Sequence, residues 1–213
     1  MNKNLLSTKR LTSLAMFAAI AYMAVFFIRI PVVMFLKYEP KDVIISIAGF
    51  IFGAVPALIV TVVVSFVEMI TISTTGPIGC IMNILATSFF ALPAAIAYKK
   101  HRNIKSAIYG LLIGTVLMTL CMLLWNYLLT PLYLHVPREE VIKILGPVIL
   151  PFNIFKGLLN AGFTILLYKP LVMGLRYANL APTGPAPEKI SLRKSLVSAC
   201  ILIAIGLAIS QVI

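Results

Sequence analysis

Long apolar runs dominate the chain, and short polar segments separate them. A transmembrane helix needs about 20 apolar residues, because about 30 Å of hydrocarbon is crossed at 1.5 Å per residue. Six runs approach or reach this length, and each predicts a helix. The second run is short, and the segment "FGAVP" joins it tightly to the third. The predicted helices cover residues 11–30, 43–53, 56–72, 78–98, 107–131 and 146–168.

The C-terminal part of the chain follows a different pattern. Residues 181–189 are rich in proline, which is typical of a semi-rigid linker. Residues 190–213 contain another apolar run, which predicts a possible seventh transmembrane helix. We therefore expect an all-α membrane protein with a six-helix bundle at 1–180, a linker at 181–189 and an additional hydrophobic helix at 190–213.

The composition agrees with a polytopic membrane protein. Hydrophobic residues make up 61% of the chain and charged residues 11%, and the mean hydropathy is +1.05. A net charge of +12 is also found in nucleic-acid-binding proteins, but here the basic residues lie in short loops between apolar runs. We interpret the charge as a topology signal and expect the lipid bilayer, not nucleic acid, as the surroundings.

The distribution of lysine and arginine predicts the orientation, because positive loops stay on the cytoplasmic side. Counted by loop, twelve of these residues lie on one side and five on the other. The larger count includes the N-terminal segment, so the N-terminus is predicted to be cytoplasmic. The loops at 31–42, 73–77 and 132–145 are then predicted to face outward from a bacterial plasma membrane.

Polar side chains occur at similar depths in four of the predicted helices. Given the predicted orientation, Glu68, Asn83, Asn126, Asn153 and Lys156 all fall in the outer third of their helices. Polar groups in lipid are costly and normally face the bundle interior or a water-filled cavity. This convergence predicts a polar cavity that opens to the outside.

The sixth helix carries three of its polar residues on one face. Asn153, Lys156 and Asn160 are spaced i, i+3 and i+7, which places them within about 60° of arc at 100° per residue. Other interpretations stay open. The Lys156 side chain is near enough to the surface to extend its ammonium to the lipid headgroups. Asn126 lies between two aromatic residues that favour the membrane interface, and Glu68 could simply pair with Lys156.

The types of polar group in this cluster limit the chemical class of ligand that it can bind. Amides, one ammonium and one carboxylate suit a neutral or mildly anionic molecule with many hydrogen-bond donors and acceptors. Apolar and aromatic residues near the same ends of the helices could cover a planar ring system, as ligand pockets commonly do. The candidates for such ring contacts are Leu36, Tyr38, Tyr127, Tyr133, Phe152 and Phe155.

The motifs of energy-converting and hydrolytic enzymes are absent from the sequence. It contains no GxxxxGK[ST] phosphate loop, no HExxH and no GxSxG. Three isolated cysteines indicate neither a metal site nor a disulfide framework. We therefore expect no enzymatic activity, no cofactor and no metal, and we expect a partner to supply the energy for any transport.

Small residues on two of the predicted helices are candidates for close helix contacts. Ala15 and Ala19 form a small-xxx-small pattern on the first helix. Gly110 and Gly114 form a second, weaker pattern on the fifth. Either stripe could dock a partner protein.

Four segments resemble, in order and spacing, the riboflavin-specific S component of energy-coupling factor (ECF) transporters. The resemblance covers about residues 8–172, and its most specific features are the Asn-Tyr before a proline on the fifth helix and the Pro-Phe-Asn-x-x-Lys on the sixth. The segments are "LKYEPKDVIISIAGFIFG", "TGPIGCIMNILATSFFALPAAIAYKK", "WNYLLTPLY" and "PFNIFKGLLN".

The resemblance implies a substrate-binding subunit that captures riboflavin from outside, with the loop after the first helix closing over the pocket. Matching motifs place Asn126, Asn153 and Lys156 in the binding site. Less specific matches add Tyr38, Glu39 and Asn83. The resemblance also implies that Ala15 and Ala19 contact a transmembrane coupling (T) protein, which joins two ATP-binding-cassette ATPases. The family needs only six helices, so residues 190–213 depart from its pattern.

Two alternatives remain open at the level of sequence. Another vitamin or flavin mononucleotide could be the ligand, because Lys156 would favour an anion. A membrane-embedded enzyme acting on lipid-like substrates would need acidic metal ligands near the membrane surface. Glu139 and Glu140 are the only adjacent acidic pair.

Overall fold

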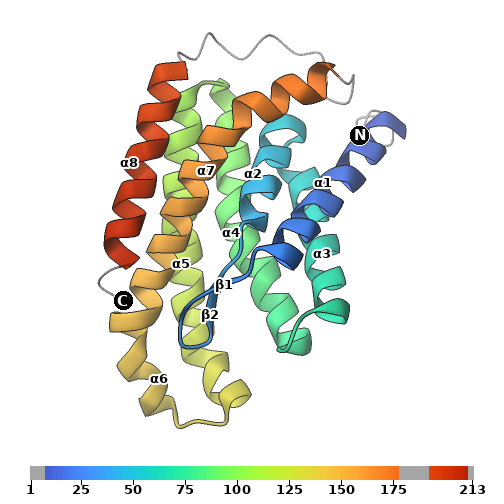
Figure 1. Ribbon diagram of the computed structural model, residues 1–213. Coiled ribbons are helices and arrows are strands. Elements are labelled where there is room, and N and C mark those ends of the chain that lie inside the picture. Colours follow the sequence, from blue (N-terminus) through green and yellow to red (C-terminus); the bar gives the residue numbers. More distant parts are fainter. Residues whose placement is uncertain (1–7, 178–191, 211–213) are drawn as a thin grey trace.

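The computed structural model describes residues 8–177 and 192–210, which form a bundle of helices with one short hairpin (Figure 1). The predicted linker at 181–189 lies outside the described residues. The elements are α1 (Thr8–Phe27), β1 (Ile30–Val33), β2 (Leu36–Tyr38), α2 (Lys41–Phe52), α3 (Ala54–Thr71), α4 (Gly76–His101), α5 (Ile104–Leu134), α6 (Arg138–Ile144), the π-helical segment η1 (Leu145–Ile149), α7 (Leu150–Tyr177) and α8 (Leu192–Ser210).

The helices match the apolar runs, which confirms the predicted all-α membrane fold. Five helical stretches in the described part of the chain are long and apolar enough to cross a membrane. The short second run forms α2, whose 12 residues span only about 18 Å. Because α2 packs against α1, α3, α4 and α7, it is buried on almost every side. This central position explains why α2 is apolar all round.

Close crossings hold α5 against its neighbours. A Cβ added at Gly114 would lie 2.2 Å from the Phe90 carbonyl oxygen of α4, and one at Gly110 would lie 2.8 Å from Ala94 Cα. These glycines are therefore needed inside the bundle, where they let the α4 and α5 backbones touch. The suggestion that Gly110 and Gly114 dock a partner is wrong for this reason.

Two segments that read as loops in the sequence have structure of their own. Residues 30–38 form an antiparallel hairpin with a register shift, and Met34 at its turn has a left-handed φ of 47°. Near α7, the chain passes through α6 and then η1, which contains Pro147 and is followed by Pro151 in the first turn of α7. Neither proline has a backbone N–H to donate, so both interrupt the regular α-helical hydrogen bonds. Both features lie at the same end of the bundle (Figure 1).

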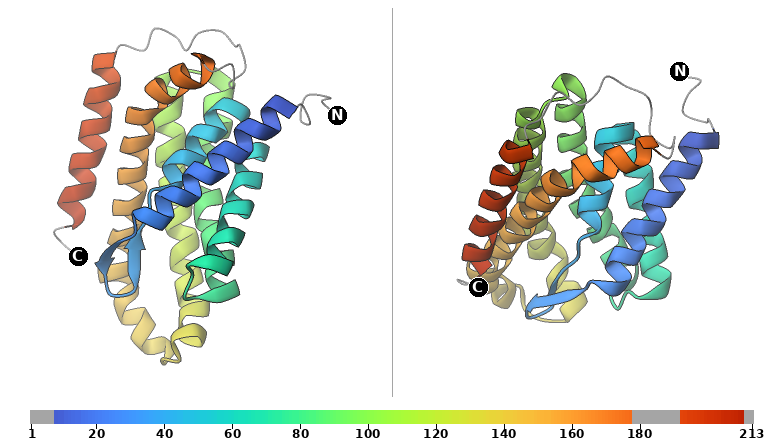
Figure 2. Two further views of the ribbon diagram at one scale, coloured as in Figure 1. Left: turned by 45° about the vertical axis from the view of Figure 1, so that its right-hand side comes forward. Right: turned by 45° about the horizontal axis from the view of Figure 1, so that its top comes forward.

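The C-terminal helix α8 packs along α7 in the opposite direction (Figure 2). Gly162 of α7 permits the contact, because a Cβ there would lie 2.5 Å from Ile203 and 3.1 Å from the Ala199 carbonyl oxygen. Gly206 of α8 faces Leu158 at a similar crossing. The predicted C-terminal helix is thus confirmed as an added layer on the helix that carries Lys156.

Candidate functional site

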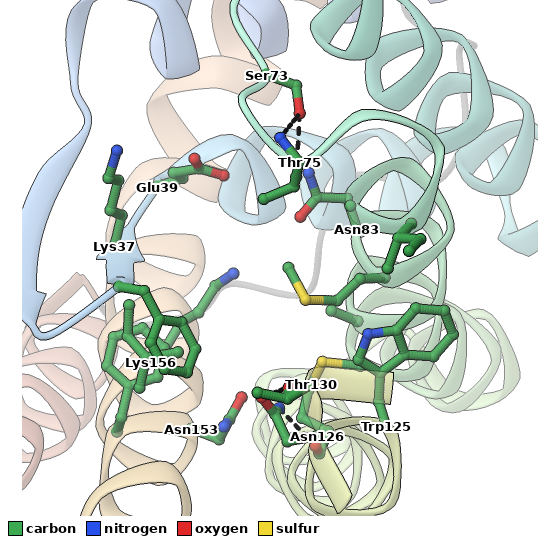
Figure 3. A pocket seen from close by; sticks show the side chains of 18 of the residues that line it. Lys37, Glu39, Ser73, Thr75, Asn83, Trp125, Asn126, Thr130, Asn153 and Lys156 are labelled. Carbon is green, nitrogen blue, oxygen red and sulfur yellow. Dashed lines mark hydrogen bonds between the residues drawn. The ribbon is translucent and has the colours of Figure 1, made fainter. Parts of the chain in front are cut away.

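A cavity of about 250 Å³ lies at the end of the bundle that carries the hairpin (Figures 1 and 3). The hairpin, the turn between α3 and α4, and the nearby ends of α4, α5 and α7 form its walls. Of the residues singled out from the sequence, the cavity brings together Leu36, Glu39, Glu68, Asn83, Asn126, Asn153 and Lys156.

Asn126 and Asn153 face each other from α5 and α7 across one end of the cavity (Figure 3). The Asn126 amide nitrogen donates to the Met122 carbonyl oxygen at 2.7 Å, and its amide oxygen accepts from Thr130 Oγ1 at 2.8 Å. The Asn153 amide nitrogen donates to the Ile149 carbonyl oxygen, in η1, at 2.8 Å. These bonds fix both amides, so the site is ordered before a ligand enters.

Lys156 projects its ammonium group toward the centre of the cavity (Figure 3). The residue is only 8% exposed, and its Nζ lies 3.4 Å from Asp42 Oδ2. This separation is longer than the roughly 2.7–2.9 Å of a strong charge-assisted hydrogen bond. An ammonium has three donors, so Lys156 retains donors for a ligand while Asp42 balances its charge.

Asp42 is not among the site residues predicted from the sequence, because the pattern of apolar runs places residues 31–42 in an external loop. The structure instead buries both Lys41 and Asp42 in the first turn of α2. The available signal was their position at the start of the apolar segment "KDVIISIAGF". A charge pair that begins a fully apolar helix is better explained by burial than by solvent exposure.

A second group of charges closes the base of the hairpin. Arg29 Nε lies 2.7 Å from Glu39 Oε1, and Arg29 Nη2 lies 2.7 Å from Glu68 Oε1. Lys41 bridges the same carboxylates, at 2.5 Å from Glu68 and 3.3 Å from Glu39. Asn83 adds a hydrogen bond to Glu68 at 3.1 Å. The idea that Glu68 pairs with Lys156 is therefore wrong, because Glu68 binds Arg29 and Lys41 instead.

The charges on Glu39 and its neighbours compensate one another. Burial by itself would raise the pKa of Glu39, but the positive charges of Lys41, Lys156 and Arg29 outweigh it and hold this pKa below its ordinary value. Together with Asp42 and Glu68, these residues form a network of three positive and three negative groups in the described part of the chain, in which Arg29 is half-buried and the others are buried. The paired charges of this network therefore compensate one another, while Lys37 adds an exposed positive charge at the edge of the cavity.

Three predicted ring contacts, Tyr38, Tyr127 and Phe155, do not line the cavity. Phe155 is buried and packs against Tyr38, with the two ring centroids 6.2 Å apart. The predicted contact of Tyr133 lies outside the side chains that the structure describes. Tyr38 is buried behind the cavity, where its hydroxyl donates to Asn160 Oδ1 at 2.9 Å, and burial raises the pKa of Tyr38 far above the neutral range. Tyr127 is 36% exposed and lies under the Arg138 guanidinium, 5.2 Å from the ring centroid. The proposed role of Tyr127 as a cavity wall is therefore wrong in this structure.

Apolar side chains supply the rest of the wall. Trp125 and Phe152 line the cavity together with Met82, Met122 and Ala86. Of these residues, only Phe152 is predicted from the sequence; Trp125 is considered there only as a neighbour of Asn126, and the methionines are not predicted. A tryptophan one position before a buried polar residue in a helix was the available signal, since adjacent positions can both border a wide cavity.

The acidic pair considered for an enzyme lies elsewhere. Glu139 and Glu140 are exposed on α6, and Glu140 pairs with Lys143 at 3.1 Å. Within residues 8–177 and 192–210, no group of three histidine, cysteine, aspartate or glutamate side chains is arranged to hold a metal ion. This geometry gives the lipid-enzyme alternative no support.

The family model for the substrate-specific component of ECF transporters matches residues 9–168. The chain belongs to this family. Its S-component fold also matches a solved structure, that of the S component of a bacterial ECF transporter. The TM-score is 0.67 at 36% identity, over 79% of this chain and 98% of the other.

Three curated relatives are riboflavin transporters. RibU from Staphylococcus aureus (strain TCH60) is 35% identical over 81% of this S component and 95% of the relative. RibU from Streptococcus thermophilus (strain ATCC BAA-250 / LMG 18311) is 28% identical over 78% and 83%. FmnP from Bacillus subtilis (strain 168) is 32% identical over 63% and 76%. The S component is thus a multi-pass membrane protein of a transporter family.

Proposed function

We propose that this S component binds riboflavin on the extracytoplasmic side and delivers it across the membrane with an ATP-driven coupling module. The observation that carries the proposal is a cavity in which two fixed amides and one charge-balanced ammonium face apolar walls. The riboflavin-transporter names of its relatives support the choice of ligand. In this proposal riboflavin is cargo, and the protein performs no chemistry on it.

The two halves of the cavity suit the two halves of riboflavin. Trp125, Phe152 and the methionine side chains offer apolar surface for a planar tricyclic ring. Asn126, Asn153 and Lys156 offer donors and acceptors for the polar edge of that ring. The hydroxyl groups of the turn between α3 and α4, from Ser73, Thr74 and Thr75, offer partners for the polyol chain.

Replacement of Lys156 by alanine tests the ligand assignment. We expect Lys156→Ala to weaken riboflavin binding at least tenfold, because a site made to pair polar ligand groups loses about 1–3 kcal/mol when one donor is removed. Quenching of flavin fluorescence by the purified protein measures the affinity. Lys143→Ala is the matched control, since Lys143 is exposed on α6 and outside the cavity. Equal affinity of Lys156→Ala and wild type would exclude Lys156 as a ligand contact.

Flavin mononucleotide is the second candidate ligand. Lys37 is exposed where the hairpin borders the cavity, and an ammonium at this edge favours a phosphate. Competition between riboflavin and flavin mononucleotide in the same titration separates the two ligands. Tighter binding of the phosphorylated flavin would favour this second candidate.

The orientation and the partners are also part of the proposal. A cytoplasmic N-terminus places the cavity on the outer side, since α1 begins at the opposite end of the bundle from the hairpin (Figure 1). Ala15 and Ala19 are exposed on α1 and offer a flat surface for the T protein. The T protein would join this subunit to two ATPases, because the chain itself has no phosphate loop.

A further inference from the structure

Asp42 is a fully buried carboxylate that borders the site without lining the cavity. Its side chain is 0% exposed, and three polar groups from two other helices surround it. Thr87 of α4 donates to Oδ1 at 2.6 Å, while Asn160 of α7 donates to Oδ2 at 3.1 Å. Lys156 Nζ lies 3.4 Å from the same Oδ2. Asp42 is thus a junction of α2, α4 and α7.

This arrangement fixes the place of the negative charge behind Lys156. Thr87 and Asn160 each hold one carboxylate oxygen, and Tyr38 in turn donates to Asn160 Oδ1 at 2.9 Å. The carboxylate therefore has little freedom to rotate. A lysine side chain has four flexible carbons and would otherwise place its ammonium in several positions.

Asp42 also compensates the positive charge of Lys156. Removing an ammonium from water is costly unless an opposite charge compensates, and breaking a buried pair by removing one partner leaves the other uncompensated. Asp42 does not line the cavity and contacts Lys156 through one oxygen at 3.4 Å, so the ammonium, with three donors, keeps donors for a ligand. The distance of 3.4 Å between Lys156 Nζ and Asp42 Oδ2 leaves the ammonium able to form shorter hydrogen bonds to a ligand.

We propose that Asp42 is a positioning residue for substrate capture, which acts through Lys156 by compensating the charge of its ammonium and directing it into the cavity. This inference rests on the proposed riboflavin binding. It assigns a role to a residue that touches no ligand in the proposed site, and it predicts that the effects of Asp42 and Lys156 on affinity are coupled.

A double-mutant cycle tests the coupling, because residues that act through one another give non-additive effects. The variants are Asp42→Asn, Lys156→Met and the double variant, with riboflavin affinity and thermal midpoint measured for each purified protein. We expect each single variant to lose at least tenfold in affinity. We expect the affinity of the double variant for riboflavin to be no lower than that of whichever single variant binds more weakly.

Ser46→Ala is the matched control on the same helix. Ser46 lies one turn after Asp42 and is also 0% exposed, and its hydroxyl has no hydrogen-bond partner within the described residues. We expect its riboflavin affinity to equal that of the wild type. A tenfold loss in Ser46→Ala would show that any change in this turn of α2 disturbs the site, which would overturn the specific role of Asp42.

The remaining outcomes are also decisive. Losses that multiply in the double variant would show that Asp42 acts independently of Lys156 and would overturn the inference. If Asp42→Asn fails to fold but the double variant folds, the uncompensated ammonium is the cause, which supports the inference. If neither folds, the role of Asp42 is structural and the inference fails. A wild-type protein that does not bind riboflavin would overturn the proposed function and this inference together.

Discussion

At the scale of single residues, charge compensation decides which polar groups the membrane-embedded bundle can hold. Arg29, Lys41 and Lys156 each lie beside a carboxylate, and the carboxylates in turn are hydrogen-bonded or paired a second time. Buried charges are tolerated when they are paired and hydrogen-bonded. The cavity can therefore remain polar inside an apolar protein and still bind an uncharged ligand.

Glu39 makes this compensation measurable as a dependence of stability on pH. The pKa of Glu39 is lowered in the folded protein. The charged side chain therefore stabilises the fold at pH values above the ordinary glutamate pKa of about 4.3. This stabilisation is lost as the pH falls through the lower pKa of the folded protein. We expect the thermal midpoint in detergent to decrease below about pH 4. Glu39→Gln should lower the midpoint at pH 7 and make the acid dependence shallower, since a charged hydrogen bond of about 1.5–3 kcal/mol is lost.

Glu139→Gln is the control for this measurement, because Glu139 is exposed on α6. Its profile should follow that of the wild type. Parallel profiles for wild type and Glu39→Gln across the acid range would mean that the pairing of Glu39 with Arg29 and Lys41 adds nothing to stability.

At the scale of elements, the sequence predicts the helices well because an apolar run long enough to cross a bilayer has few other stable structures. The convergence of Asn126, Asn153 and Lys156 was predictable for the same reason, since depth follows from counting residues along a helix. The positions of Tyr38, Tyr127 and Asp42 were not predictable. They depend on the hairpin and on helix rotation: Tyr38 and Asp42 contact Asn160, which is far away in the sequence, and Tyr127 lies under Arg138 from the next helix.

The contact between α7 and α8 gives a prediction at this scale. Leucine at Gly162 would overlap Ile203 and the Ala199 backbone and push α8 away from the helix that carries the site. We expect Gly162→Leu to destabilise the protein by about 1–3 kcal/mol, seen as a lower thermal midpoint of the purified protein. Gly174→Leu is the control on the same helix, because nothing lies within 4 Å of a Cβ there. Equal midpoints for the two variants would show that α8 does not pack on α7 as described.

At the scale of the whole molecule, the proposed site and the proposed docking surface are separate. The cavity lies between the hairpin and α4, α5 and α7, whereas Ala15 and Ala19 are exposed on α1. Substrate capture and coupling to ATP hydrolysis should therefore respond to different substitutions. A second pair of alanines, Ala204 and Ala208, is exposed with the same spacing on α8 and can serve as a control for Ala15 and Ala19.

Substitution of both stripes by leucine tests this separation. We expect the double variant Ala15→Leu/Ala19→Leu to bind riboflavin like the wild type when purified, yet to lose riboflavin uptake in cells that contain the T protein and the ATPases. Bulky side chains prevent the close backbone approach that small residues allow. The matched variant Ala204→Leu/Ala208→Leu adds the same volume on α8 and should retain both binding and uptake. Normal uptake by the α1 variant would exclude this face from docking, and equal loss in both variants would indicate a general effect of surface leucines in the membrane.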